Sequence, residues 1–145
     1  MIDVELVTRK IVLIMRDLDE MQALARETRE HFLASPISVA AAERYLERVI
    51  GRMIDINFHL ITETDHPPPS DYHQSFLDLG SLAILDPAFA RHIASAAGLR
   101  NRIAHEYEEI DPSKVYDAVH ASMRDIPIYL RQVDAWLEPP PGGAS

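Results

Sequence analysis

One short segment of the chain gathers side chains that could do chemistry together: Arg100, Asn101, Arg102, His105 and Tyr107. Arginine presents a rigid fork of donors that fits a phosphate, and histidine exchanges a proton near neutral pH. RNA cleavage through its own 2′-hydroxyl needs a base to activate that oxygen and a cation to stabilise the charged phosphorane. The segment therefore indicates metal-free RNA cleavage. The simpler alternative is that these side chains are solvated or cap a helix.

The spacing of these side chains on an ideal helix indicates how they could act together. Asn101 and His105 fall on one face, and Arg100 and Tyr107 are nearly eclipsed on the neighbouring face. Arg100 and His105 are offset by about 140° around the helix axis, so one helix alone does not aim both at one atom. A twofold dimer that packs this helix against its mate would gather both copies around a shared cleft. Such a homodimer is one arrangement in which these side chains could act on the same atom.

A second group of polar side chains lies in the middle of an apolar stretch. Asp55 and His59 are four residues apart, next to Asn57, and would share one face of a helix. Two interpretations stay open. The pair is solvated on an exposed face, or Asp55 lines a cleft against the helix that carries Arg100.

The histidines do not indicate a metal site. His59, His66 and His73 are evenly spaced, but the stretch between them runs through three consecutive prolines, so their spacing carries no geometric meaning. The chain has no cysteine, no H-E-x-x-H motif and no glycine-rich phosphate loop. We therefore expect no metal and no bound cofactor.

Apolar residues recur at steps of three and four, which is typical of amphipathic helices. We expect five helices, over residues 4–32, 38–60, 72–83, 87–110 and 112–136. Ser38 can cap the second helix, and Asp86 with Pro87 can start the fourth. Pro127 should kink the last helix or cost it a hydrogen bond.

Long helices with matching apolar stripes and short connections pack antiparallel. The fold class we expect is therefore all-α, an up-and-down bundle of about five helices in a single domain over residues 1–137. The Pro/Gly-rich residues 138–145 have little to bury and are expected to be disordered. Charged residues between the apolar positions of the first helix, Lys10, Asp17 and Glu20 among them, are expected to be solvated.

The composition limits the function classes. The chain has 145 residues and a formal net charge of −9, so it lacks the globally basic surface of a simple nucleic-acid reader. A local basic cleft remains compatible, with Arg91, His92, Arg100 and Arg102 as its expected source. No apolar run is long enough to span a membrane, and the first residues lack a signal-peptide layout. We expect a cytoplasmic protein.

The segment from Arg100 to Tyr107 also resembles a known motif. It fits the R-x4-H-x-Y pattern of HepT-like toxins, which belong to the HEPN superfamily of all-α ribonuclease domains. The likeness covers about residues 4–137. It includes several further stretches, at residues 43–60, 67–68, 72, 80–87 and 107–111.

This resemblance implies a metal-independent endoribonuclease that is the toxin of a toxin–antitoxin pair and works as a homodimer. Arg100 and His105 would be its catalytic pair, and Asn101 the polar residue that follows the arginine. Tyr107 falls where an MntA-like nucleotidyltransferase antitoxin transfers AMP from ATP. Asp55 and Arg102 are further candidates for the cleft wall.

Two other functions stay open at this point. The same fold could be a non-catalytic module that holds a nucleotide or positions a nucleotidyltransferase partner without cutting a bond. It could also be a structural helical dimer in which the segment from Arg100 to Tyr107 is only an interface.

Overall fold

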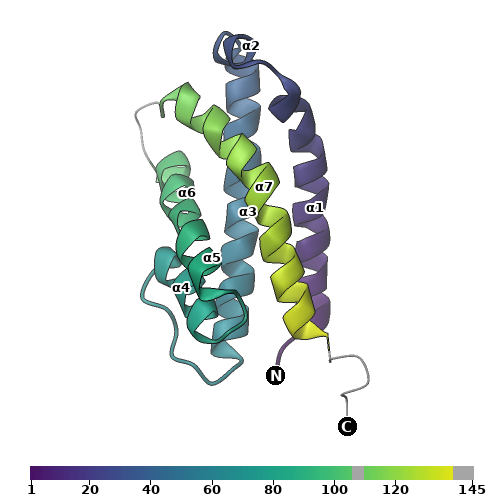
Figure 1. Ribbon diagram of the computed structural model, residues 1–145, viewed down its shortest axis with the longest axis vertical. Coiled ribbons are helices and arrows are strands. Elements are labelled where there is room, and N and C mark those ends of the chain that lie inside the picture. Colours follow the sequence, from purple (N-terminus) through teal and green to yellow (C-terminus); the bar gives the residue numbers. More distant parts are fainter. Residues whose placement is uncertain (106–109, 139–145) are drawn as a thin grey trace.

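Three long helices form the body of the protein: α1 (Val4–Arg26) and α3 (Pro36–Thr62) lie side by side, and α7 (Pro112–Leu137) crosses them diagonally (Figure 1). The computed structural model describes residues 1–105 and 110–138. Four shorter helices complete the described chain: α2 (Arg29–Leu33), α4 (Tyr72–Ser81), α5 (Pro87–Ile93) and α6 (Ser95–His105). These residues contain no strand, which confirms the all-α bundle.

The first expected helix is interrupted, because the chain turns between α1 and α2. Glu27 has an extended backbone, and the Thr28 hydroxyl caps α2 by accepting a hydrogen bond from the His31 N–H at 3.1 Å. The prediction of one helix over 4–32 is therefore wrong in its last turns. Phe32 is nevertheless fully buried, so the apolar stripe continues across the break.

The cap of the second long helix lies three residues before the predicted one, so the prediction of Ser38 as the cap is wrong. Ser35, not Ser38, caps α3, and Pro36 occupies its first turn. Ser35 Oγ accepts a hydrogen bond from the Ser38 N–H at 3.2 Å. The Ser38 hydroxyl instead donates to the carboxylate of Glu27 at 2.8 Å, which links α3 to the end of α1.

The expected helix over 87–110 is divided into α5 and α6. Asp86 caps it as predicted, accepting a hydrogen bond from the Phe89 N–H at 3.0 Å. Ala94 separates the two helices, and the Ser95 hydroxyl donates to the His92 carbonyl at 3.2 Å. Such side-chain bonds to the preceding turn compete with the helical ladder and bend helices. Residues 106–109 of the expected helix lie outside the described residues, and Ile110, its predicted last residue, is not helical.

The predicted apolar stripes of α1, α3 and α7 meet in the core, where Ile14, Leu46, Met53 and Val119 are fully buried. Asp17 contradicts its prediction, because it is only 2% exposed rather than solvated. α7 continues through Pro127, whose ring nitrogen has no hydrogen to donate to the helix ladder.

A buried polar cluster ties α3 to α4 and α7. The Tyr129 hydroxyl donates to Asn57 Oδ1 at 2.6 Å and lies 3.2 Å from the Met53 carbonyl oxygen. Asn57 Nδ2 donates to Ser75 Oγ at 3.1 Å. Burial raises the pKa of Tyr129 well above 10.0, because the phenolate would lose its solvation. Asn57 is therefore a structural residue of the core.

The shorter helices hold α6 against α3. α4 and α5 pack closely because Gly80 has no side chain. A Cβ there would lie only 2.8 Å from Cβ of Ala90. α6 packs on both α3 and α4 (Figure 1). None of the described helices is long and apolar enough to cross a membrane. The predicted disorder of 138–145 falls almost wholly outside the described residues.

Candidate functional site

Arg100 lies in a groove between α3 and α6. Its guanidinium carbon is 5.6 Å from the centre of the Tyr72 ring, on the first turn of α4. Gly51 of α3 lies next to it, since a Cβ there would be 3.9 Å from Arg100 Nε, an ordinary contact distance. Arg100 Nε is buried, and no hydrogen-bond partner for it occurs in the part of the chain that the structure describes.

Two adjoining cavities of about 360 and 250 Å³ form this groove, which we call the α3/α6 groove. Gly51, Asp55 and Arg100 line both cavities. The first cavity adds Ile54, Phe58 and Tyr72, and the second adds Arg44, Glu47, Arg48 and Arg52. The groove is thus apolar and aromatic at one end and charged at the other.

Asp55 shares the walls of this groove with Arg100, as one of its two interpretations expected. It does not pair with His59. Asp55 accepts a hydrogen bond from Lys10 Nζ of α1 at 3.1 Å, and His59 Nε2 accepts one from the Asp3 N–H at 2.9 Å. The side chain of Asp55 is 59% exposed, so this ion pair is a surface one.

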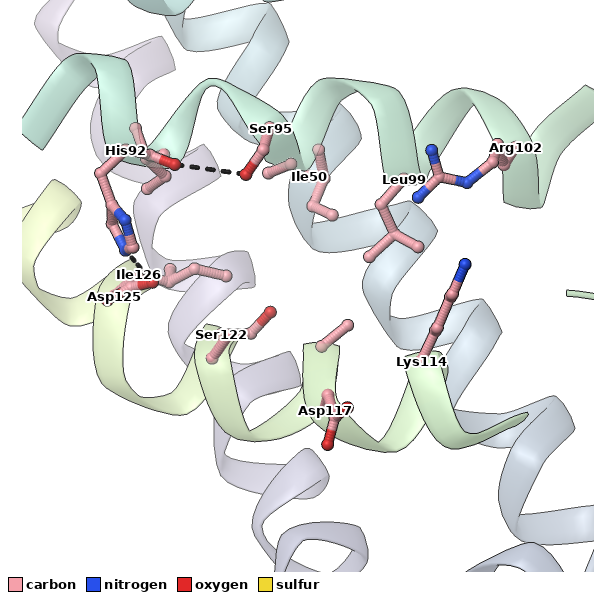
Figure 2. Close-up of a pocket in the computed structure, with 14 residues that line it drawn as sticks. Ile50, His92, Ser95, Leu99, Arg102, Lys114, Asp117, Ser122, Asp125 and Ile126 are labelled. Atoms are coloured by element: carbon pink, nitrogen blue, oxygen red, sulfur yellow. Dashed lines mark hydrogen bonds and ion pairs between the residues drawn. The ribbon is translucent and has the colours of Figure 1, made fainter. Parts of the chain in front are cut away.

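Arg102 faces a different cavity from Arg100. Two residues along a helix correspond to a rotation of about 200°, which places their side chains on opposite sides of α6. Arg102 lines a cavity of about 380 Å³ between α6 and α7, where its guanidinium lies opposite Lys114 (Figure 2). His92 closes the other end, where its Nε2 lies within hydrogen-bond distance of Asp125 Oδ2, at 2.8 Å. The structure therefore does not bring Arg102 and His92 to Arg100.

Asn101 and His105 are both exposed on α6, four residues apart and on one face. His105 is the last residue of α6. Tyr107 lies outside the described residues, so the structure does not place it. The described chain contains no group of three or more His, Asp or Glu residues that could hold a metal ion.

Sequence reasoning missed the charged end of the groove. Arg44, Arg48 and Arg52 recur at intervals of four along α3, so they lie on one helix face. This spacing is visible in the sequence. It was not interpreted as a site because these residues fall between the apolar positions of α3, where charged side chains are usually only solvated.

The groove has the chemistry to hold an anion, and a proton carrier lies further along the same helix on another face. Arg100 offers donors that the described chain leaves partly unused. His105 is one and a half turns further along the same helix, and its ring is exposed to solvent. A single protomer therefore supplies an anion-binding arginine and an accessible imidazole, on different faces of α6.

The sequence matches a family model described as ribonuclease HepT-like, over residues 14–133. Among curated proteins, the tRNA nuclease HepT of Aphanizomenon flos-aquae (strain 2012/KM1/D3) is 32% identical over 132 residues. That match covers 91% of this chain and 90% of the relative.

Among the solved structures that share the fold are two toxin–antitoxin complexes. One is a toxin–antitoxin complex with AMP-PNP, at a TM-score of 0.82 and 20% identity, covering 90% of this chain and 98% of that chain. The other is a tri-AMPylated HEPN toxin of Shewanella oneidensis in complex with an MNT antitoxin, at a TM-score of 0.81 and 21% identity. It covers 93% of this chain and 99% of that chain. The family match spans the bundle and the motif helix together, so the chain belongs to the HepT-like ribonuclease family.

Proposed function

We propose that this protein is the toxin of a toxin–antitoxin pair and a metal-independent endoribonuclease. Membership of a ribonuclease family supports the reaction class. One observation carries the proposal for the site: Arg100 lies in a groove with a buried Nε that has no partner among the described residues. A phosphate would supply the missing acceptor, because guanidinium groups bind phosphate through charge-assisted hydrogen bonds.

In this mechanism Arg100 binds the scissile phosphate and stabilises the charge that develops on it. His105 exchanges the proton of the 2′-hydroxyl or of the leaving oxygen, the acid–base role that histidine side chains commonly take in catalysis. Asn101, on the same face as His105, orients the imidazole or the hydroxyl. No step requires a metal or a bound cofactor.

The offset of Arg100 and His105 on α6 is the reason for proposing a homodimer. Residues five apart point about 140° away from each other on a helix. A twofold axis beside α6 would bring His105 of one protomer towards Arg100 of the other. The catalytic cleft would then be shared.

The proposal includes inactivation by an MntA-like nucleotidyltransferase antitoxin that uses ATP as the donor of AMP. The MNT antitoxin bound to the AMPylated neighbour supports this partner. AMP on Tyr107, two residues from His105, would add bulk and a phosphodiester charge next to the cleft. Peptide mass spectrometry after incubation with antitoxin and ATP should find AMP on Tyr107 and leave the Tyr107→Phe protein unmodified there.

The first test is RNA cleavage in the presence of EDTA. The wild-type protein should cleave RNA and leave cyclic phosphate or 3′-phosphate ends. His105→Ala and Arg100→Ala should each lower the rate by about 10²- to 10⁴-fold, the usual contribution of a general acid–base group or of a charge-stabilising donor. His31→Ala and Arg131→Ala are matched controls on α2 and α7. Equal rates in all four variants would contradict the assignment.

A mixing experiment tests the shared cleft. Arg100→Ala and His105→Ala proteins, each inactive alone, are combined under conditions in which subunits exchange. Each mixed dimer retains one intact arginine and one intact histidine across the twofold axis, so activity should return. If each protomer holds a complete site, the mixture stays inactive.

A further inference from the structure

Three arginines form a continuous strip along α3 that ends beside Arg100. We call Arg44, Arg48 and Arg52 the arginine ridge. The exposed fraction of their side chains falls from 69% to 39% to 21% towards Gly51, where Arg100 lies against α3. All three line the charged end of the α3/α6 groove together with Arg100. The ridge and the proposed catalytic arginine therefore face the same space.

A buried carboxylate holds two of these arginines in place. Asp17 of α1, with its side chain 3% exposed, accepts a hydrogen bond from Arg52 Nη1 at 2.5 Å. Arg48 Nη2 lies 3.3 Å from the other oxygen of Asp17. One carboxylate balances one of the two guanidinium charges, so the pair retains positive charge. Because the carboxylate is fixed in the core, the two guanidinium groups are oriented before any ligand arrives.

Acidic side chains around the groove do not neutralise the ridge. Glu47 is 3.9 Å from Arg44 Nη1, which is a loose contact. Asp55 is paired with Lys10, and Glu20 accepts a hydrogen bond from the Tyr45 hydroxyl at 2.7 Å. The groove therefore keeps an excess of cationic groups, on a chain whose net charge is −9.

The spacing of the ridge suits a chain of phosphates. Four residues of α-helix rise about 6 Å, so the arginines form a ladder of evenly spaced cationic groups. A nucleic-acid strand presents its phosphates as a similarly regular series, and contacts from Arg and Lys to them supply much of the binding free energy. A local strip is needed here, because the overall negative charge of the protein repels RNA at longer range.

We propose that the arginine ridge binds the sugar–phosphate backbone of single-stranded RNA and leads it to Arg100. This inference rests on the proposed function. It says which surface of the protein binds the part of the RNA that lies away from the cleaved bond. Arg44 and Arg48 make phosphate contacts, and Asp17 is a positioning residue that orients Arg48 and Arg52. The contacts are to phosphates, so they favour no base sequence.

The test measures RNA binding to a protein that cannot cut its ligand. In the His105→Ala background, we compare Arg44→Ala/Arg48→Ala with a matched double variant, Arg9→Ala/Arg131→Ala, that removes the same charge elsewhere. Arg52 is left intact, so that the buried Asp17 keeps one of its two arginine partners when Arg48 is removed. The probe is a fluorescein-labelled single-stranded RNA of mixed sequence, titrated at several salt concentrations. Thermal unfolding checks that all variants fold.

The ridge variant should bind this RNA about tenfold more weakly than its parent at moderate salt. The slope of log affinity against log salt should become shallower by about 1.4, since each phosphate contact to a single strand contributes about 0.7. The Arg9→Ala/Arg131→Ala variant should keep the slope of its parent. An unchanged slope in the ridge variant, or an equal loss in the matched variant, would overturn the inference.

Cleavage kinetics separate this inference from the proposed function. With His105 intact, Arg44→Ala/Arg48→Ala should raise KM for the RNA more than it lowers kcat. If the wild type cleaves RNA and the ridge variant has the same KM, the inference fails and the proposed function stands. If the wild type does not cleave RNA at all, the proposed function fails. If the ridge variant loses affinity for the antitoxin but not for RNA, the ridge is a protein interface and the inference is wrong.

Discussion

α3 carries two polar regions, and they differ in how far their hydrogen-bonding groups are paired. On its core side, Asn57 joins Tyr129 and Ser75 in a cluster whose bonds are 2.6 and 3.1 Å long. On its groove side, Gly51 faces Arg100, whose buried Nε has no partner among the described residues. The two regions lie less than two turns apart on one helix.

This difference separates what stabilises the fold from what can bind a ligand. Buried polar groups are almost always paired, because an unpaired one loses its hydration without compensation. The Asn57 cluster follows that rule, and it fixes α4 and α7 against α3. Arg100 departs from it at the wall of a cavity, where an incoming acceptor can reach the side chain. Mutations in the cluster should therefore affect stability, and mutations in the groove should affect RNA cleavage.

The largest effect on stability is expected at Asn57. Asn57→Leu leaves the hydroxyls of Tyr129 and Ser75 without their amide partner in the core. We expect the free energy of unfolding to fall by about 2–4 kcal/mol, since more than one buried group loses a partner. Chemical denaturation followed by circular dichroism measures this loss.

Asn101→Leu is the matched control for stability, because it makes the same change on the exposed face of α6. It should alter the free energy of unfolding by less than about 0.5 kcal/mol. If Asn57→Leu were as stable as Asn101→Leu, the cluster would not have the structural role that its hydrogen bonds indicate.

The next effect concerns the groove, and it should appear in activity without a loss of stability. A Cβ on Gly51 would lie 3.9 Å from Arg100 Nε, which is ordinary contact, but a longer side chain would occupy the place of the guanidinium. Gly51→Leu should lower RNA cleavage about tenfold or more by displacing Arg100. Its stability should stay equal or rise, because leucine favours the helix by up to about 1 kcal/mol over glycine.

Gly98→Leu provides the comparison within α6. Its Cβ would lie 3.8 Å from Arg102 Nη1, on the side of α6 away from the α3/α6 groove. It should share the gain in helix propensity and retain RNA cleavage. Equal losses of cleavage at both glycines would indicate a general distortion of α6 rather than displacement of Arg100.

Much of the fold followed from the spacing of apolar residues. The stripes of α1, α3 and α7 and the cap at Asp86 were confirmed, because helical periodicity and N-cap chemistry are local properties. The breaks at Glu27 and Ala94 were missed. Each break depends on a side chain that bonds to nearby backbone, Thr28 in one case and Ser95 in the other, which periodicity alone does not reveal.

The candidate site could be proposed from the sequence only where its residues share a helix. Arg100, Asn101 and His105 stand close together in the sequence of α6, whereas the roles of Asp17 and Asn57 depend on which helices pack together. Asp17 lies in a stretch of α1 that also contains Arg16, Asp19 and Glu20, and its burial against two α3 arginines is a tertiary effect.

Arg102 shows that closeness in the sequence does not ensure a shared site. Its place in the segment suggested a shared cleft with Arg100, yet the helix turns it towards Lys114 and a separate cavity (Figure 2). A rotation of about 200° between the two arginines was available from the sequence. The position of α7, which supplies the second wall of that cavity, could not be predicted from the sequence.

The smallest effect that we predict concerns the buried Tyr129, and it changes the free energy of unfolding only at alkaline pH. The folded state raises the pKa of Tyr129 well above 10.0 by burial, so folding favours the neutral phenol. Its contribution to stability is fully present below pH 10.0 and is lost as pH rises towards the folded pKa. Between pH 10.0 and the folded pKa, the wild type should lose about 1.4 kcal/mol per pH unit relative to Tyr129→Phe, which has no phenol to ionise.

The measurement is the free energy of unfolding of both proteins as a function of pH. Below pH 10.0 the difference should be constant, with Tyr129→Phe less stable by about 1 kcal/mol because it loses the bond to Asn57. Above it, the difference should shrink and then reverse. A difference that stays constant through the alkaline range would mean that the Tyr129 phenol ionises as freely in the folded protein as in the unfolded chain. The buried cluster would then be open to solvent, and its contrast with the groove would disappear.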